Sequence, residues 1–164
     1  MKIKLKIKNQ KVKNKGFTLI ELLVVIAIIG ILATLLMSNF IGIRQRARDG
    51  KRKSDLSQIQ AALEQYRADN GSYYMGNLTC NSTFTSPTNV NIVYMKKVPC
   101  DPFEQSGQSY YNSGSYYYSS PDGIKYTLGA CLENASDPQG TTQSPDGSTI
   151  TGCTSSTYYV VLNP

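Results

Sequence analysis

The sequence predicts an α+β protein in which one long N-terminal helix packs against a small antiparallel β-sheet. An uncharged apolar run at residues 22–43 leads directly into an amphipathic helical pattern. After Gly71 the composition changes to Ser, Thr, Asn, Gly and Tyr, with strand-like runs between turn signals. We therefore expect four segments: a basic leader at 1–16, a transmembrane and assembly helix at 17–43, an amphipathic continuation at 44–70, and a β-rich head at 71–164.

The apolar run is the strongest single feature of the chain. From Leu22 to Ile43 no residue is charged, and a helix of that length spans about 33 Å, enough for the hydrocarbon core of a bilayer. A cleaved signal peptide would have a shorter apolar region followed by small residues at its cleavage site. A buried core helix would need a much larger domain to cover it on every side. We expect the chain to cross the cytoplasmic membrane once.

The basic residues lie mainly at the two ends of this run. The chain has 17 Lys and Arg against 11 Asp and Glu. Residues 1–16 carry seven of the basic residues and residues 44–53 carry six, which leaves four against nine acidic residues in 54–164. This distribution differs from that of a globular nucleic-acid-binding protein, and we expect no specific nucleic-acid site. For Lys51, Arg52 and Lys53 we expect contact with lipid headgroups.

Catalytic chemistry has little support in this composition. The chain contains no His, which excludes Ser-His-Asp and Cys-His catalysis. We recognise no nucleophile–base set, metal cluster or glycine loop either. The sequence therefore predicts that the protein is not an enzyme.

The cysteines indicate on which side of the membrane the head lies. The even set Cys80, Cys100, Cys131 and Cys153 follows the apolar run and contains no C-x-x-C pair. It predicts two disulfides in an oxidising compartment, which places the head outside the cytoplasm. Three pairings are possible, and we expect the nearest-neighbour pairing of Cys80 with Cys100 and Cys131 with Cys153.

The helical pattern continues beyond the apolar run. Leu56, Ile59, Leu63 and Tyr66 recur at spacings of three and four residues, and Ala62 widens the apolar seam. The opposite face is expected to be polar and consists of Ser54, Asp55, Ser57, Gln58, Glu64 and Gln65. Asp69-Asn70-Gly71 is a good helix stop, since Asn and Gly tolerate the left-handed conformation.

The head is predicted to form a sheet of three or four antiparallel strands. The strand-like runs are Asn91–Met95, Ser109–Ser119, Ile124–Leu132 and Thr157–Leu162. Turn signals such as Pro121-Asp122-Gly123 separate them. Residues 134–156 are expected to form a long loop closed by a disulfide.

Specific motifs resemble a known family. The run Lys15-Gly16-Phe17-Thr18-Leu19-Ile20-Glu21-Leu22, followed by the apolar stretch, resembles the type III signal of type IV pilins and type II secretion pseudopilins. Tyr66-Arg67-Ala68-Asp69-Asn70-Gly71-Ser72-Tyr73 is similar to the helix end of the G-type major pseudopilin. Val98-Pro99-Cys100-Asp101-Pro102 is similar to the Asp-Pro loop of that group.

The resemblance implies the type IV pilin fold and a structural function. A prepilin peptidase would cut after Gly16, and the new amine of Phe17 would be N-methylated. Copies of the chain would then assemble, with identical or homologous pilin subunits and on an inner-membrane assembly platform, into a filament in the periplasm or at the cell surface. Both a type II secretion pseudopilus and a type IV pilus fit this description. The alternative function is a monomeric membrane-anchored binding or adhesin domain, supported only by the Tyr-rich sheet.

The chain departs from G-type pseudopilins in lacking a recognisable calcium loop. Asp122, Glu133 and Asp137 lie in the corresponding third of the chain, but their spacing is not that of a ligand loop. We interpret them as solvated turn carboxylates and expect no cofactor; calcium is the alternative, which no recognisable loop supports.

Glu21 is the costly residue of the apolar helix. A carboxylate in such a helix costs roughly 2.5–3.5 kcal/mol on insertion scales, so it requires a partner or a position near the interface. We expect it to drive and register assembly by meeting the Phe17 amine of a neighbouring subunit. The competing interpretation is that Glu21 only reaches the nearby interface within one subunit.

Overall fold

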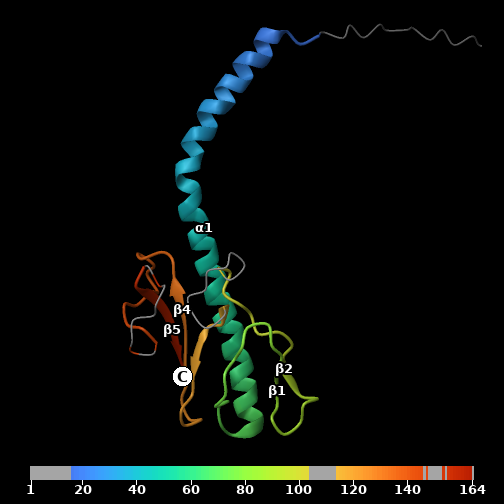
Figure 1. Ribbon diagram of the computed structural model, residues 1–164, viewed down its shortest axis with the longest axis vertical. Helices are drawn as coiled ribbons and strands as arrows, with labels where there is room; N and C mark the ends of the chain where they lie inside the picture. Colours follow the sequence, from blue (N-terminus) through green and yellow to red (C-terminus); the bar gives the residue numbers. More distant parts are fainter. Residues whose placement is uncertain (1–15, 104–113, 146, 148–152, 154, 164) are drawn as a thin grey trace, which may run out of the picture. The chain divides into compact units, whose positions relative to one another are not determined.

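The computed structural model describes residues 16–103, 114–145, 147, 153 and 155–163, without the side chains of Leu35, Ser38 and Asn39 (Figure 1). The chain divides into a first unit at residues 1–40 and a second unit at 41–164. Helix α1 (Leu19–Asn70) begins in the first unit and ends in the second, and all five strands belong to the second. The structure is thus α+β, with a helix packed on small antiparallel sheets, as predicted.

The end of α1 lies where the sequence predicts it. The helix stops at Asn70, and Gly71 adopts a left-handed conformation with φ of 75° while its amide donates to the Arg67 carbonyl at 2.8 Å. A residue without Cβ adopts this conformation at no steric cost. The chain then turns back, and the Tyr73 amide donates to the Gly123 carbonyl at 2.7 Å.

The strands form two separate sheets, which corrects the prediction of a single one. Strands β3 (Tyr117–Ser119), β4 (Thr127–Leu132) and β5 (Thr157–Leu162) form an antiparallel sheet in the order β3-β4-β5. Strand β2 (Val93–Met95) instead pairs with β1 (Phe84–Thr85), a strand that was not predicted. These two short strands form a hairpin, and their pairing is irregular between Phe84 and Thr85. Residues 109–113 of the predicted third strand lie outside the described residues.

The core of the second unit forms around the predicted apolar seam of α1. Leu56, Ile59, Ala62, Leu63 and Tyr66 are all buried. They pack with side chains from the three-stranded sheet and the segment before it, namely Tyr116, Tyr126, Leu128 and Ala130. Burial of this stripe against a sheet is what makes an amphipathic helix stable in a small domain.

An aromatic cluster attaches the small hairpin to the end of α1. The ring of Tyr66 stacks on Phe84 of β1 at 5.4 Å between centroids, and it meets Tyr94 of β2 edge-on at 5.2 Å. Asn70 donates from its side chain to the Tyr94 hydroxyl at 3.0 Å. Such aromatic pairs add to the stabilisation that comes from burial alone, and they position a hairpin too small to be stable by itself.

Candidate assembly site

The start of α1 is closed by a reciprocal cap between Thr18 and Glu21. The Glu21 carboxylate accepts hydrogen bonds from the amide and the hydroxyl of Thr18, both at 2.8 Å. The Glu21 amide donates in turn to the Thr18 hydroxyl at 3.3 Å. This is a capping box, which satisfies amides that have no partner within the helix. Sequence reasoning missed it, although the signal T-x-x-E was present at residues 18–21.

The predicted cleavage position lies immediately before this cap. Gly16 and Phe17 precede the helix and are exposed, with Phe17 at 82 % of its accessible surface. A Cβ built on Gly16 would meet no atom within 4 Å. The Gly16–Phe17 bond is therefore accessible in this chain. Most of the predicted leader, residues 1–15, lies outside the described residues.

Between the cap and Phe40 the described side chains of α1 are exposed and mostly apolar. They include Leu22, Val25, Ile29 and Leu32, each at 46–59 % exposure, together with Leu36 and Met37 above 70 %. Among the residues that the structure describes, we find no helix of sufficient length and hydropathy to cross a membrane, and the predicted single pass is not confirmed.

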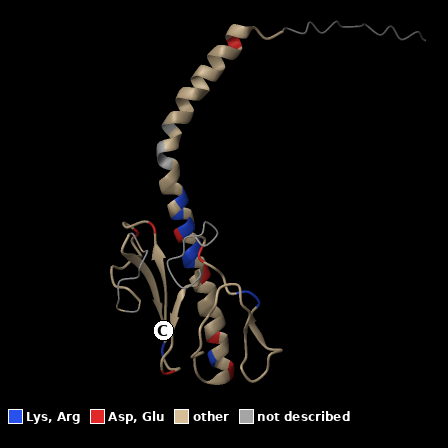
Figure 2. Cartoon of the chain, viewed as in Figure 1, with Lys and Arg blue, Asp and Glu red and all other residues tan. Residues whose placement is uncertain are grey.

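In the basic stretch that follows, Arg52 is buried and Lys53 pairs with Asp137, which corrects the lipid contact expected for these two residues, while Lys51 is exposed. Figure 2 shows basic residues grouped along one part of α1. Arg52 is fully buried and its guanidinium donates to both carboxylate oxygens of Asp101 at 2.9 Å. It also donates to Asp49 at 2.7 Å and to Glu133 at 2.8 Å. Burial opposes its charge, but these carboxylates raise the pKa of Arg52 above its usual range.

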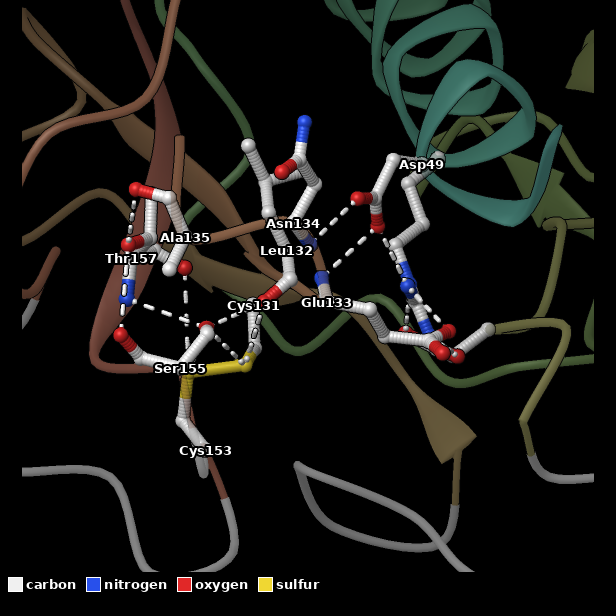
Figure 3. Close-up of a disulfide and its surroundings, with 11 residues drawn as sticks. Asp49, Cys131, Leu132, Glu133, Asn134, Ala135, Cys153, Ser155 and Thr157 are labelled. Atoms are coloured by element: carbon white, nitrogen blue, oxygen red, sulfur yellow. Dashed lines mark hydrogen bonds and ion pairs between the residues drawn. A yellow bond between two sulfur atoms is a disulfide. The ribbon is translucent and has the colours of Figure 1, made fainter. Parts of the chain in front are cut away.

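Asp49 joins the helix to the end of strand β4. Its two carboxylate oxygens accept hydrogen bonds from the backbone amides of Glu133 and Asn134, both at 2.9 Å (Figure 3). These amides follow the last residue of β4, where the ladder ends, and the Asp49 carboxylate satisfies them. Asp49 and Arg52 therefore tie α1 to the sheet at one point and, through Asp101, to the Asp-Pro loop.

The carboxylates that were interpreted as solvated turn residues have two different roles. Glu133 pairs with Arg48 at 2.5 Å as well as with Arg52, and Asp137 pairs with Lys53 at 2.6 Å. Burial opposes the charge of each carboxylate, but these cations lower the pKa of both. Only Asp122 is an exposed turn carboxylate. It accepts the amides of Ile124 and Lys125, and these hydrogen bonds lower its pKa.

Asp55 was predicted on the polar face of α1, and this prediction was wrong. Its side chain is buried, accepts the Tyr116 hydroxyl at 2.8 Å and pairs with Lys51 at 3.2 Å. Burial and the neighbouring Asp55 charge raise the pKa of Tyr116 well above its usual range, so the hydroxyl remains a donor at every physiological pH.

Both disulfides are formed in the nearest-neighbour pairing. Cys80 bonds to Cys100 and Cys131 bonds to Cys153. The second joins the end of β4 to the residues before β5 and closes most of the long loop, whose positions 146, 148–152 and 154 lie outside the described residues (Figure 3). The Ser155 hydroxyl donates to the Leu132 carbonyl across the same connection.

Metal binding has no support in the geometry of the described residues. No group of three or more Cys, Asp or Glu side chains is arranged there to hold an ion. Asp49, Asp101 and Glu133 each pair with the Arg52 guanidinium, which lies among them.

Asp49 and Arg52 were missed as structural residues, although a signal was available. They lie seven and four residues before Leu56, so they extend the spacing of the apolar seam toward the N-terminus. Charged residues that continue the helical spacing of a buried apolar stripe are expected to be buried as well, each paired with an opposite charge. Their partner Asp101 is 49 residues away from Arg52 in the sequence, and no periodic spacing there predicts its burial.

Comparisons with known proteins agree with this organisation. The model of the prokaryotic N-terminal methylation motif matches residues 11–37, and that of type II secretion system protein G matches residues 39–128. The chain is 39% identical to type II secretion system core protein G of Escherichia coli K12 over 98 residues, which cover 56% of this chain and 68% of the relative. It is 33% identical to the protein of the same name from Vibrio cholerae over 129 residues, which cover 72% and 82%. It is 36% identical to that of Pseudomonas aeruginosa over 101 residues, which cover 57% and 71%. No solved structure matches the chain.

Proposed function

Since this chain belongs to the type II secretion system protein G family, we propose that it is a pseudopilin, a structural subunit of an extracytoplasmic filament that assembles through its N-terminal helix. The observation that carries this proposal is the order of features at residues 16–40. An accessible Gly16–Phe17 bond precedes a capped helix whose exposed side chains are apolar. The membership does not favour the alternative of a monomeric binding or adhesin domain.

Maturation requires cleavage of one peptide bond and addition of one methyl group. Prepilin peptidase removes residues 1–16 and the Phe17 amine is then methylated. Removal of the leader takes away seven Lys residues. The intact mass after co-expression with the peptidase should fall by residues 1–16 and rise by one methyl. A mature chain that still begins at Met1 would contradict the proposal.

Before assembly the subunit is held in the cytoplasmic membrane by residues 22–43, with residues 71–164 outside the cytoplasm. The length of the uncharged run supports this arrangement, and so do two disulfides that need an oxidising compartment. Its partners are other pilin-like subunits, the peptidase, an inner-membrane assembly platform and the membrane lipid. In this proposal it carries out no catalysis and needs no cofactor, and we expect no specific nucleic-acid site.

Glu21 drives and registers assembly in this proposal. Cleavage creates a positive amine on Phe17, four residues from the Glu21 carboxylate. If the amine of one subunit meets the carboxylate of its neighbour, the cost of both charges in lipid is relieved and one axial offset is selected. Apolar helices alone cannot select an offset, because lipid tails are as apolar as their side chains. Breaking a buried pair of this kind costs about 3–5 kcal/mol.

Capping of α1 is a competing local function for Glu21, and two substitutions distinguish capping from registration of the filament. Glu21→Gln removes the charge but retains a side chain that serves in a capping box, whereas Thr18→Ala removes the capping hydroxyl and retains the charge. If the charge registers the filament, Glu21→Gln should be inserted and cleaved but should yield few sheared filaments. Thr18→Ala should assemble almost normally.

Two further substitutions set the scale of this experiment. Glu21→Ala loses both functions and should assemble poorly, and Glu21→Asp should be intermediate because its carboxylate is one methylene shorter. Filament yield is measured by shearing and immunoblotting, relative to the cleaved subunit in the membrane. A wild-type yield from Glu21→Gln, together with a low yield from Thr18→Ala, would assign Glu21 to capping instead of registration.

A further inference from the structure

Two exposed surfaces of the second unit lie at the two ends of its part of α1. The exit surface consists of Ile43 and Arg46, where α1 enters the second unit. The tip surface consists of Asp69, Met75, Asp122 and Ile124, where α1 ends. Each combines exposed apolar side chains with charged ones, and the charges have opposite signs.

The tip surface is a single structure made from two segments. The Tyr73 amide donates to the Gly123 carbonyl at 2.7 Å, which holds the chain after α1 against the turn between β3 and β4. A Cβ built on Gly123 would lie 3.6 Å from the Met75 sulfur. Met75 and Ile124 are nevertheless 67 % and 65 % exposed. Large apolar side chains exposed together at one end of a small domain are typical of a contact surface.

Asp69 lies at an unfavourable place for a carboxylate within one subunit. It belongs to the last turn of α1, where the carbonyl groups give the helix end a partial negative charge. Arg67, the cation of the same turn, donates to the Tyr73 hydroxyl at 2.8 Å and lies over its ring. A cation from outside its own subunit would therefore stabilise the exposed Asp69 carboxylate. Asp122 adds a second carboxylate to this surface, beside the exposed Lys125.

The exit surface has the complementary composition. Ile43 is 59 % exposed, and Arg46 follows it at a spacing of three residues, on the same side of the helix. Unlike Arg52, Arg46 is exposed. One turn further along, the cations are directed into the carboxylate cluster of the second unit.

We propose that the tip surface of one subunit docks on the exit surface of a second copy of this chain, with Asp69 facing Arg46 and with Met75 and Ile124 covering Ile43. The proposal rests on the filament function given above. The 23 helical residues between Arg46 and Asp69 correspond to about 35 Å, so the second copy is displaced along the helix axis by that distance. This neighbour differs from the one that supplies the Phe17 amine, which is only four residues from Glu21.

A second copy is the occupant that fits both surfaces. Lipid covers an apolar helix while the subunit is in the membrane, but a subunit in the filament has left the lipid. Ile43 then faces water unless another protein covers it. Lipid headgroups would attract Arg46 but would repel Asp69 and Asp122, whereas a second copy of the chain satisfies both ends with one contact.

The test is charge reversal with rescue in the full chain, expressed with its peptidase and assembly platform. Arg46→Asp and Asp69→Arg are made singly and together, and sheared filaments are measured relative to cleaved subunit in the membrane. We expect each single reversal to lower filament yield at least fivefold, and the double reversal to recover at least half of the wild-type yield. Ser57→Arg, which adds a cation at an exposed position of α1 between the two surfaces, is the matched control and should leave the yield unchanged.

A second measurement separates assembly from folding. Asp69→Arg places a cation at the negative end of α1, so the melting temperature of the cleaved subunit in detergent should stay the same or rise while its filament yield falls. A double reversal that yields no more than the single ones would overturn the contact. A loss with Arg46→Asp but none with Asp69→Arg would also overturn it and assign the arginine to lipid headgroups. A wild-type chain that forms no filament would instead refute the proposed function, and the contact with it.

Discussion

Replacing the buried Arg52 by Met should destabilise the second unit more than a single substitution at its surface or in its loops does. The guanidinium makes four hydrogen bonds to three carboxylates and is 0% exposed. Arg52→Met keeps most of the apolar stem and removes the charge. Asp49, Asp101 and Glu133 then stay at most 6% exposed, without their shared cation.

The magnitude follows from the partners that remain. Asp49 keeps two backbone amides, Asp101 keeps the Phe103 amide at 2.8 Å, and Glu133 keeps Arg48. Removing one member of a buried ion pair costs about 3–5 kcal/mol. Because every carboxylate retains at least one partner, we take about 4 kcal/mol, which for a domain of this size lowers the melting temperature by about 15 °C.

The assay is thermal unfolding of the cleaved full chain in detergent, followed by circular dichroism. Arg46→Met is the matched control, since it makes the same chemical change at an exposed position of the same helix, and it should alter stability by less than about 0.5 kcal/mol. Arg52→Lys should be intermediate, because an ammonium group does not reproduce the two parallel bonds to Asp101. A loss for Arg52→Met no larger than that for Arg46→Met would refute the view that this cluster ties the helix to the sheet.

Two further predictions concern the disulfides and the response to acid. Replacing Cys131 and Cys153 together by Ser opens a connection of 22 residues and should cost about 3 kcal/mol of stability in the chain-entropy model. The equivalent change at Cys80 and Cys100, which are 20 residues apart, is the control and should cost about the same. An unchanged melting temperature in reducing buffer would contradict both expectations. The pKa of Glu133 is lowered in the folded state, so its stabilisation is complete above its ordinary value of about 4.3 and is lost as the pH falls through the folded pKa. Melting temperatures measured from pH 7 to pH 3 should therefore decline below about pH 4.3, less steeply in Glu133→Gln, and identical profiles for the two proteins would show that this carboxylate does not contribute.

Much of the helix was predictable because its signals are local. The apolar spacing from Leu56 to Tyr66 identified the buried stripe, and Asn70-Gly71 marked its end. Both depend on the period of a helix and the conformational freedom of a few residues. The start motif was equally local, although its capping box was overlooked. The fold class and the family resemblance followed from these elements.

The division of the strands into two sheets was less predictable. The predicted run at Asn91–Met95 contains β2, but its partner β1 has only two residues and no alternating pattern. A strand of this kind is stabilised by its contacts, in this case the packing of Phe84 against Tyr66 and Tyr94, and these residues are far apart in the sequence.

The sequence by itself determined the order of the segments, the bounds and buried stripe of the amphipathic helix, and the cysteines available for two disulfides. The tertiary structure decided what each charged residue does. In the sequence, Lys51, Arg52 and Lys53 are three equal cations, and Asp55 is one more polar residue. In the fold, Arg52 is buried among carboxylates that lie 49 and 81 residues away, and Asp55 accepts a hydroxyl 61 residues away. The energy of a charge depends on its burial and on the groups around it, and only the folded chain brings those groups together.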